Sequence, residues 1–412
     1  MPLRRRRAAD PRRDREPSQP GGNPVSWNPS PTVPSGSALA TFLAGVRVLD
    51  LSQYIPGPLA TLLLADMGAE VLKVEPPRGD EMRTLGPRDA LGRPIFYNSL
   101  NAGKTVKRLD LKDDADRSVF LDLARSADVV VEGFRPGVLE RLGVGYEVLK
   151  SVNPRIVLCS INGYGARSAY AAKAGHDANY LALKGMLDRN GTDKPIFFDP
   201  PVSDVAGSLF AAIAILGALH GRVRTGKGCA IDLALADTAM PLQLIQIAAY
   251  GANGTIPARG ETYLNGGAAY YQVYATRDGR YVVLGAIEPK FWEAFCNTAG
   301  RSDWIERQLE ALPQHALRDA VASFFSSLSK DEIEARFQDV DCCLSIVNDL
   351  GEALADVHTA ERGLVRRNAE GDLQALFPAL IDGTPPSPRS PLSQTDHPRP
   401  AAAGASTAHD RT

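Results

Sequence analysis

Four acid and base side chains stand in short motifs that could carry out proton-transfer chemistry. His176 and Asp177 are adjacent in "AGHDANY", and only six histidines occur among the 412 residues. Histidine has the side chain whose ordinary pKa lies nearest neutral pH, so His176 is a candidate general base, or equally a loop residue that caps a helix. Asp204 lies in "SDVAGS" and Glu288 in "GAIEP". Glu288 could polarise an imidazole or be an exposed loop acid.

The position of Asp204 allows two interpretations. It precedes a long apolar run, and aspartate at such a place is commonly the N-cap of a helix. Alternatively, the free N–H groups of a helix start, next to the small residues Gly207 and Ser208, could stabilise a developing oxyanion. Asp204 would then act on a bound substrate.

The apolar pattern predicts the elements that must position these residues. The segment "GVRVLDLSQYIPGPLATLLLADMGAEVLKVEPP" predicts a βαβ unit with a helix from about Pro58 to Met67, and hence a parallel sheet. The runs "VKRLDL", "ADVVVE" and "RIVLCSI" predict further strands, and a long helix and another strand are expected after residue 202. The first half is therefore predicted to be a doubly wound α/β domain. The segment "YYQVYATRDGRYVVLGAI" predicts a hairpin in a smaller α+β domain.

Composition and short motifs exclude several classes of function. The formal charge of −2 gives no reason to expect a nucleic-acid or membrane partner, and the longest apolar run, "LFAAIAILGAL", is too short to span a bilayer and predicts a buried helix. The five cysteines show no metal-binding spacing, so we expect no metal site and a cytoplasmic protein. The turn "IPGPLA" lacks the glycines of a dinucleotide site, and its prolines lack N–H donors for phosphate.

Several motifs in one order resemble the class III CoA-transferase family, most closely its α-methylacyl-CoA racemase branch. They are "GPLATLLLADMGAEVLKVE", "EGFRPGVLERLGVGY", "AGHDANY", "SDVAGS" and "GGAAYYQVYATRDGRYVVLGAIEPKFW", and the likeness covers about residues 43–395. The resemblance implies a large Rossmann-like domain, a small domain and a segment that returns to the large one. It also implies an interlocked homodimer in which Glu288 would approach His176 from the partner chain.

The domain boundaries follow from this resemblance and from composition. We expect a disordered basic and Pro-rich tail at 1–38, the large CoA-binding domain at 39–235, linker helices and the small α+β domain at 236–357, the return segment at 358–395 and a disordered tail at 396–412.

The resemblance also implies the chemistry. In the racemase branch, His176 and Asp204 would be the two acid/base groups, while Glu288 and Asp177 would orient and tune the imidazole. The substrate would be a 2-methylacyl-CoA thioester whose α-carbon is inverted, with no cofactor beyond the CoA moiety. In the transferase branch, Asp204 would instead carry the acyl group and then CoA as an aspartyl-CoA thioester. A catalytically inactive CoA-binding protein is the third alternative.

The family pattern further implies contacts to CoA. Lys104, Arg135 and Arg141 would bind its phosphates, since a guanidinium forms two parallel charge-assisted bonds to phosphate. Arg78 and Arg83 are weaker candidates. Gly163, Tyr164 and Gly165 would let the pantetheine arm pass close to the backbone, or would simply form a glycine-rich turn after a strand.

Overall fold

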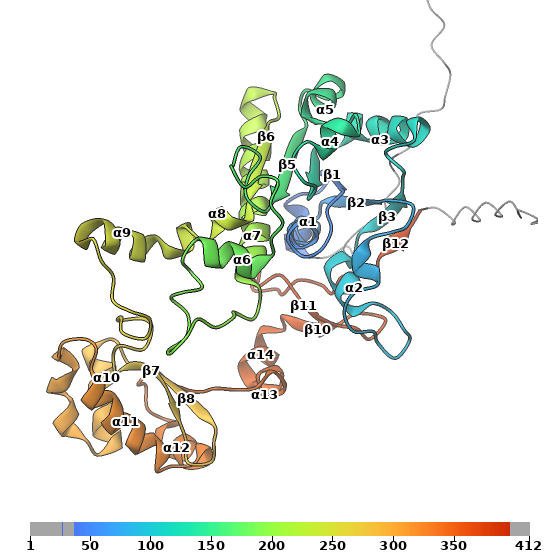
Figure 1. Cartoon of the computed structure of the whole chain (residues 1–412). Coiled ribbons are helices and arrows are strands. Elements are labelled where there is room, and N and C mark those ends of the chain that lie inside the picture. Colours follow the sequence, from blue (N-terminus) through green and yellow to red (C-terminus); the bar gives the residue numbers. More distant parts are fainter. Residues whose placement is uncertain (1–26, 28–36, 396–412) are drawn as a thin grey trace, which may run out of the picture.

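The large domain is built on a seven-stranded, entirely parallel sheet (Figure 1). The computed structural model describes residues 27 and 37–395. The strand order is β12-β3-β2-β1-β4-β5-β6. The strands are β1 (Arg47–Asp50), β2 (Glu70–Glu75), β3 (Thr105–Arg108), β4 (Val129–Glu132), β5 (Val157–Asn162), β6 (Ala230–Ala234) and β12 (Ser393–Gln394). The predicted parallel α/β fold is confirmed.

Helices cover both faces of this sheet. The helices in this part of the chain are α1 (Pro56–Asp66), α2 (Ile95–Asn101), α3 (Asp114–Ser126), α4 (Val138–Arg141), α5 (Tyr146–Val152), α6 (Asp177–Leu183), α7 (Val202–Thr225), α8 (Leu235–Thr238) and α9 (Leu244–Asn253), the last of which extends away from the sheet (Figure 1). Short 3₁₀ turns are η1 (Ala38–Thr41), η2 (Glu81–Arg83) and η3 (Pro241–Gln243). Helix α1 begins at Pro56, two residues before the predicted start, because proline suits the first helical turn, where no N–H is required.

Alternating strand residues point into two separate cores. Val48, Val129 and Val131 pack with α1 and α7 on one face, while Leu49 and Val130 pack with α3 and α5 on the other. Successive side chains of a strand point to opposite faces, so a sheet buried on both sides has apolar residues at nearly every position. Helix α7 therefore packs against the sheet, and this packing positions the residues of its first turn, among them Asp204.

The sheet contains a topological switch point. The strand order reverses between β1 and β4, which are paired in parallel. In open α/β sheets, ligands bind in the crevice at the carboxyl ends of the strands where the order reverses. The loops after β1, β4 and β5 therefore mark the edge at which a ligand site is expected.

A second lobe is built on an antiparallel sheet of β7 (Tyr271–Ala275), β8 (Tyr281–Gly285) and β9 (Leu344–Ile346), which lies within the interval predicted for the small domain. Its helices are α10 (Pro289–Ala299), α11 (His315–Ser326) and α12 (Lys330–Phe337), with η4 (Ser302–Trp304) and η5 (Glu306–Leu309). Aromatic rings fill its core, and Phe295 stacks on Trp292 and Phe325. This lobe has a core of its own.

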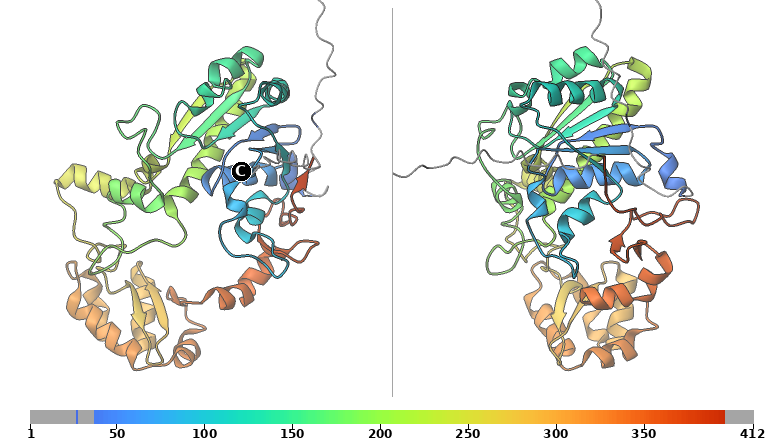
Figure 2. Two further views of the ribbon diagram at one scale, coloured as in Figure 1. Left: turned by 45° about the vertical axis from the view of Figure 1, so that its right-hand side comes forward. Right: turned by 90° about the vertical axis from the view of Figure 1, so that its right-hand side faces the viewer.

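The chain then returns to the large sheet. It passes through α13 (Leu350–Ala355), α14 (Val357–Arg362) and the hairpin of β10 (Val365–Arg367) and β11 (Leu373–Ala375) before β12 pairs with β3. All three views show the small lobe set apart from the sheet domain and joined to it by the segment after α9 and by α13 and α14 (Figures 1 and 2).

Helices α9 and α7 each leave several large apolar side chains exposed. Helix α9 has no buried residue, and Leu244 and Ile245 are 66% and 62% exposed. Helix α7 was predicted to be buried, but only one face is, since Ala211 and Ile215 lie in the core while Ile213 is 62% exposed. By length and composition, α7 is the one helix in the described chain that could cross a membrane, a test that core helices of soluble proteins also pass.

The predicted tails lie almost entirely outside the described residues. Within the interval 1–38, Trp27 is partly buried, and its Nε1 donates to Glu70 Oε2 at 2.6 Å. The guanidinium of Arg47 lies 5.5 Å from the centre of the indole ring. Trp27 is therefore held against the sheet domain beside β1 and β2.

Candidate active site

The predicted chemistry-bearing residues of the large domain gather beyond the carboxyl ends of the strands. The loop of Gly163–Gly165 follows β5, α6 begins at Asp177, and α7 begins at Val202. Helix α6 packs against both α7 and α8. The structure thus brings the start of α6, with His176, next to the start of α7, with Asp204.

A single carboxylate joins these two helix starts. Oδ1 of Asp177 accepts hydrogen bonds from the backbone N–H of Ser203 at 2.6 Å and of Asp204 at 3.1 Å. These are first-turn amides that have no acceptor within their own helix. Asp177 therefore caps α7 from another element.

This contact corrects two predictions. Asp177 was expected to orient the imidazole, but within the described chain no hydrogen bond or ion pair joins it to His176, and its Oδ1 serves α7 instead. The amides at the start of α7 were expected to hold an oxyanion, yet those of Ser203 and Asp204 already have Asp177 as acceptor. The N-cap interpretation of Asp204 is also wrong, because the helix begins at Val202 with Pro201 as N-cap.

The carboxyl group of Asp204 lies in an environment that favours its neutral form. Burial, and secondly the negative charge of Asp177, raise the pKa of Asp204 to about 6. Both causes disfavour the carboxylate, the first by desolvation and the second by repulsion. A carboxyl group with a pKa near the working pH is suited to both giving and taking a proton.

Tyr180 is a part of the site that the sequence analysis missed. Its hydroxyl donates to the carbonyl of Gly175 at 2.5 Å, and burial, with the nearby charge of Asp204, raises its pKa to about 12. Its ring packs edge-on against Tyr164 with the centroids 5.2 Å apart. The sequence contained one sign of this: Tyr180 follows His176 by four residues, and residues four apart on a helix lie on the same face.

The glycine-rich loop after β5, which was predicted to contact pantetheine, leaves room for the packed rings of Tyr164 and Tyr180. A Cβ atom on Gly163 would lie 2.8 Å from the Tyr180 hydroxyl, and one on Gly175 would lie 2.5 Å from that of Tyr164. Neither glycine can therefore be replaced without movement of a tyrosine. The role of Gly163, Tyr164 and Gly165 in contacting CoA stays a prediction.

His176 is exposed and is the N-cap residue of α6. Its backbone N–H donates to Oδ1 of Asn179 at 3.0 Å, and its carbonyl accepts from the Asn179 N–H at 2.8 Å. The capping interpretation thus holds for the backbone of His176. Its imidazole remains at the surface, where a substrate can reach it.

Glu288 is not brought to His176 within one chain. It is exposed and is the N-cap residue of α10 in the small lobe, which Figure 1 shows apart from α6 and α7. Its charge contributes to raising the pKa of Cys343, after burial of that thiol. The predicted contact between Glu288 and the imidazole therefore requires a second chain.

Lys104 was predicted to bind phosphate, and the structure contradicts this. Its side chain is fully buried, and Nζ lies within hydrogen-bond distance of Asp50 Oδ2, Thr61 Oγ1, Asn101 Oδ1 and the carbonyl of Pro58, at 2.8 to 3.1 Å. An ammonium group has three protons to donate, so none is left for a ligand. Lys104 is part of the protein interior.

The two arginines of "FRPGVLERLG" are placed where a phosphate could reach them. Arg135 follows β4 at the switch point and Arg141 ends α4. Both are exposed, and neither forms an ion pair with another described residue. Of the weaker candidates, Arg78 is exposed, whereas Arg83 is paired with Glu75 at 2.9 Å and donates to the Tyr97 hydroxyl.

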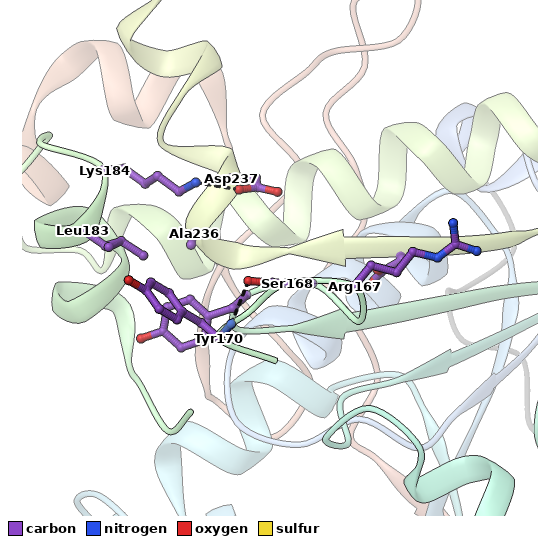
Figure 3. A pocket seen from close by; sticks show the side chains of 10 residues that line it. Arg167, Ser168, Tyr170, Leu183, Lys184, Ala236 and Asp237 are labelled. Carbon is purple, nitrogen blue, oxygen red and sulfur yellow. Dashed lines mark hydrogen bonds and ion pairs between the residues drawn. The ribbon is translucent and has the colours of Figure 1, made fainter. Parts of the chain in front are cut away.

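A cavity of about 540 Å³ opens beside the site (Figure 3). Tyr164, Gly165, Tyr170 and Leu183 form part of its wall. Lys184 and Asp237 also line it and form an ion pair of 2.8 Å, and Arg167 points away from that pair (Figure 3). His176 and Asp204 do not line this cavity, so it adjoins the candidate site without containing these two residues.

Comparison with known proteins gives a consistent result. The sequence model of CoA-transferase family III matches residues 43–396. The chain is 33% identical over 350 residues to human alpha-methylacyl-CoA racemase, covering 84% of this chain and 88% of that protein. It is 32% identical over 357 residues to acetyl-CoA:oxalate CoA-transferase of Acetobacter aceti, covering 82% and 89%. The solved structure of a CAIB/BAIF family protein from Brucella suis superposes with a TM-score of 0.74 at 28% identity, covering 87% of this chain and 96% of that one.

Proposed function

Since the chain belongs to CoA-transferase family III, we propose that it is an enzyme that inverts the α-carbon of a 2-methylacyl-CoA thioester. The observation that carries the proposal is the contact of Asp177 with the amides of Ser203 and Asp204. Through this contact Asp177, the neighbour of His176, holds the backbone of Asp204, the second proposed acid/base group. The similarity to alpha-methylacyl-CoA racemase supports the same reaction.

The reaction needs two groups on opposite faces of the substrate. One of His176 and Asp204 takes the α-proton, and the electron pair of the broken C–H bond moves onto the thioester oxygen as an enolate. The other group then gives a proton to the opposite face of the same carbon, forming the new C–H bond. Both steps transfer only protons, so they need no cofactor besides the CoA moiety of the substrate.

The enolate oxygen needs donors other than those first expected. The amides of Ser203 and Asp204 are taken by Asp177, whereas the N–H groups of Asp177 and Ala178, at the start of α6, have no acceptor among the described residues. We assign the stabilisation of the enolate to this pair. One such donor typically contributes about 10²- to 10³-fold to the rate.

The nucleotide part of CoA is assigned to Arg135 and Arg141. Both guanidinium groups are exposed and free of carboxylate partners in the described chain, and Arg135 follows a strand at the switch point of the sheet. Lys104 is not part of this proposal, because its ammonium group is buried and fully used.

We propose that two chains assemble so that Glu288 of one meets His176 of the other. The exposed apolar residues Leu244 and Ile245 of α9 and Ile213 of α7 support this assembly, since exposed apolar surface of this kind marks protein interfaces. In a dimer with twofold symmetry, two equivalent sites would form. Each would combine a large domain with the partner's small lobe.

CoA transfer between carboxylic acids is the second candidate, because Asp204 alone could form the covalent intermediate. The similarity to acetyl-CoA:oxalate CoA-transferase favours this alternative. The carboxylate would attack the thioester carbonyl, CoA thiolate would leave, and the thiolate would attack the resulting anhydride to give aspartyl-CoA thioester and free acid.

Hydroxylamine distinguishes the two reactions. Acyl-CoA is incubated with the protein and hydroxylamine, and the peptide containing Asp204 is analysed by mass spectrometry. The racemase proposal predicts an unmodified Asp204, while a hydroxamate there, absent from Asp204→Asn, would establish the transferase. Loss of substrate chirality without an acceptor acid is measured in the same samples.

A further inference from the structure

Asp177 holds two amides of another helix with one carboxylate oxygen. The distances from its Oδ1 are 2.6 Å to the N of Ser203 and 3.1 Å to the N of Asp204. Asp177 caps α7 from outside that helix, and its carboxylate accepts from N–H groups that have no acceptor within α7. It also fixes the direction in which the first turn of α7 leaves the sheet edge, and hence where the side chain of Asp204 stands.

The first turn of α7 has a second fixed point on α8. Ser203 is fully buried, and its hydroxyl donates to the carbonyl of Leu235 at 2.6 Å and lies 3.3 Å from the hydroxyl of Thr238. Asp204, one residue later, lacks such side-chain partners among the described residues. Its position therefore depends on the backbone on either side of it, which Asp177 and Ser203 hold.

Asp177 also stands out among the titratable groups around Asp204. The others on the elements that pack against α7 are Asp66 of α1, Cys159 of β5, Tyr180 of α6, Asp232 of β6 and Asp237 of α8. Asp66 is paired with Arg389, Asp237 with Lys184, and Asp232 accepts from the amide of Ala166. Of these titratable groups of the described chain, only Asp177 forms a hydrogen bond with residue 204.

We infer that Asp177 is a positioning residue for Asp204: it fastens the first turn of α7 to the start of α6 and sets the electrostatic environment in which Asp204 exchanges protons. The inference rests on the proposed function only for its effect on turnover. The same contact exists whichever reaction Asp204 performs.

The two tasks of Asp177 are separable by substitution. Asp177→Asn keeps an acceptor oxygen for the two amides but removes the charge, because a side-chain amide is also a good helix cap. Asp177→Ala removes both. Asp113→Ala is the matched control. Oδ1 of Asp113 accepts from the N–H groups of Ala115 and Asp116 at the start of α3, each at 3.0 Å. Helix α3 is distant from the site in sequence and lies on the other face of the sheet.

Two measurements need no catalytic activity. The first is ¹³C NMR titration of protein labelled at aspartate carboxyl carbons, with the signal of Asp204 identified by its loss in Asp204→Asn. The second is hydrogen exchange of the amides of Ser203 and Asp204. We expect the midpoint of Asp204 to fall in both Asp177 variants, because a repelling charge is gone. Exchange should become about 2- to 30-fold faster in Asp177→Ala and stay nearly unchanged in Asp177→Asn.

The activity measurement is the pH dependence of kcat/KM. The acid limb should move to lower pH in Asp177→Asn, and kcat should fall by about 10- to 100-fold in Asp177→Ala, as for a displaced catalytic group. Asp113→Ala should change amide exchange at α3 alone.

An unchanged titration midpoint of Asp204 in both Asp177 variants, or unchanged amide exchange in Asp177→Ala, would overturn the inference. If the unaltered protein fails to turn over any thioester, the proposed function fails, while NMR and exchange still decide the role of Asp177.

Discussion

The backbone N–H of Asp204 donates a hydrogen bond of 3.1 Å to the carboxylate of Asp177, so an acid in the first turn of α7 is held by the residue that follows His176. Consecutive Cα atoms lie about 3.8 Å apart, so this bond brings His176 and Asp204 into one neighbourhood although they are 28 positions apart in sequence. It also places two carboxyl groups beside each other, and the chemistry of Asp204 follows from that.

Asp204→Asn should stabilise the protein at neutral pH. The raised pKa of Asp204 means that the folded state prefers the neutral acid, so the stability it contributes is present below about pH 4 and is lost as pH rises to about 6. Asparagine stays neutral throughout. At pH 7.5 the gain should reach up to about 3 kcal/mol, at 1.36 kcal/mol per pKa unit.

Thermal unfolding of both proteins from pH 4 to pH 8 measures this gain. The difference in Tm should be small at pH 4 and should grow through pH 6. A difference that is constant over this range would show that Asp204 is not forced towards its neutral form.

Lys104→Met should lower the free energy of unfolding by about 3 to 5 kcal/mol, because it leaves the carboxylate of Asp50 buried without one of its cations. Burial alone would raise the pKa of Asp50, but Lys104 and Lys73 hold it well below its ordinary value. Urea unfolding measures the loss, with exposed Lys112→Met as control. A stable Lys104→Met protein with weakened CoA binding would instead restore the phosphate-ligand assignment.

Arg135→Ala and Arg141→Ala should each raise KM for an acyl-CoA by about 10- to 100-fold without lowering Tm, as expected when one charge-assisted contact is lost. The matched substrate is the acyl-pantetheine thioester, which lacks the nucleotide phosphates. With it, the variants should behave like the unaltered protein. Arg155→Ala, an exposed arginine just before β5 at the opposite edge of the sheet, is the control. Equal losses with both substrates would argue against phosphate contacts.

Mixed dimers test whether Glu288 acts across subunits. His176→Ala and Glu288→Ala should each have little activity alone. After co-expression, half of the dimers should contain both variants and one intact site, which restores about a quarter of the full activity. A mixture no more active than its two components would place Glu288 outside the partner's site or exclude the dimer.

The repeating apolar pattern was enough to predict the parallel sheet, because strands buried on both faces carry apolar residues at nearly every position, as Val129 to Val131 do. The ordered motifs were enough to predict the family. The long helix after residue 202 was also foreseen, though not its exposed face, since composition does not tell which side of an apolar helix lacks a neighbour.

The roles of individual polar residues were harder to predict. The family pattern implied that Lys104 of "NAGKT" binds phosphate. Its partner Asn101 belongs to the same motif, but Asp50 and Thr61, which hold the ammonium group in the interior, reach it only through the fold. The sequence places Asp177 next to His176, and the family resemblance implied that it orients the imidazole. In the structure the backbone of α7 supplies two donors for its carboxylate, and these are contributed by residues 26 and 27 positions later.

The most direct test of the account is NMR of a 2-methylacyl-CoA incubated with the pure protein in D₂O, without any acceptor acid. We expect deuterium to enter the α position with loss of chirality, and either His176→Ala or Asp204→Ala to abolish both. Absence of exchange across short, branched and steroid-derived acyl groups, with CoA moving once a free acid is added, would contradict the racemase and assign Asp204 as a nucleophile.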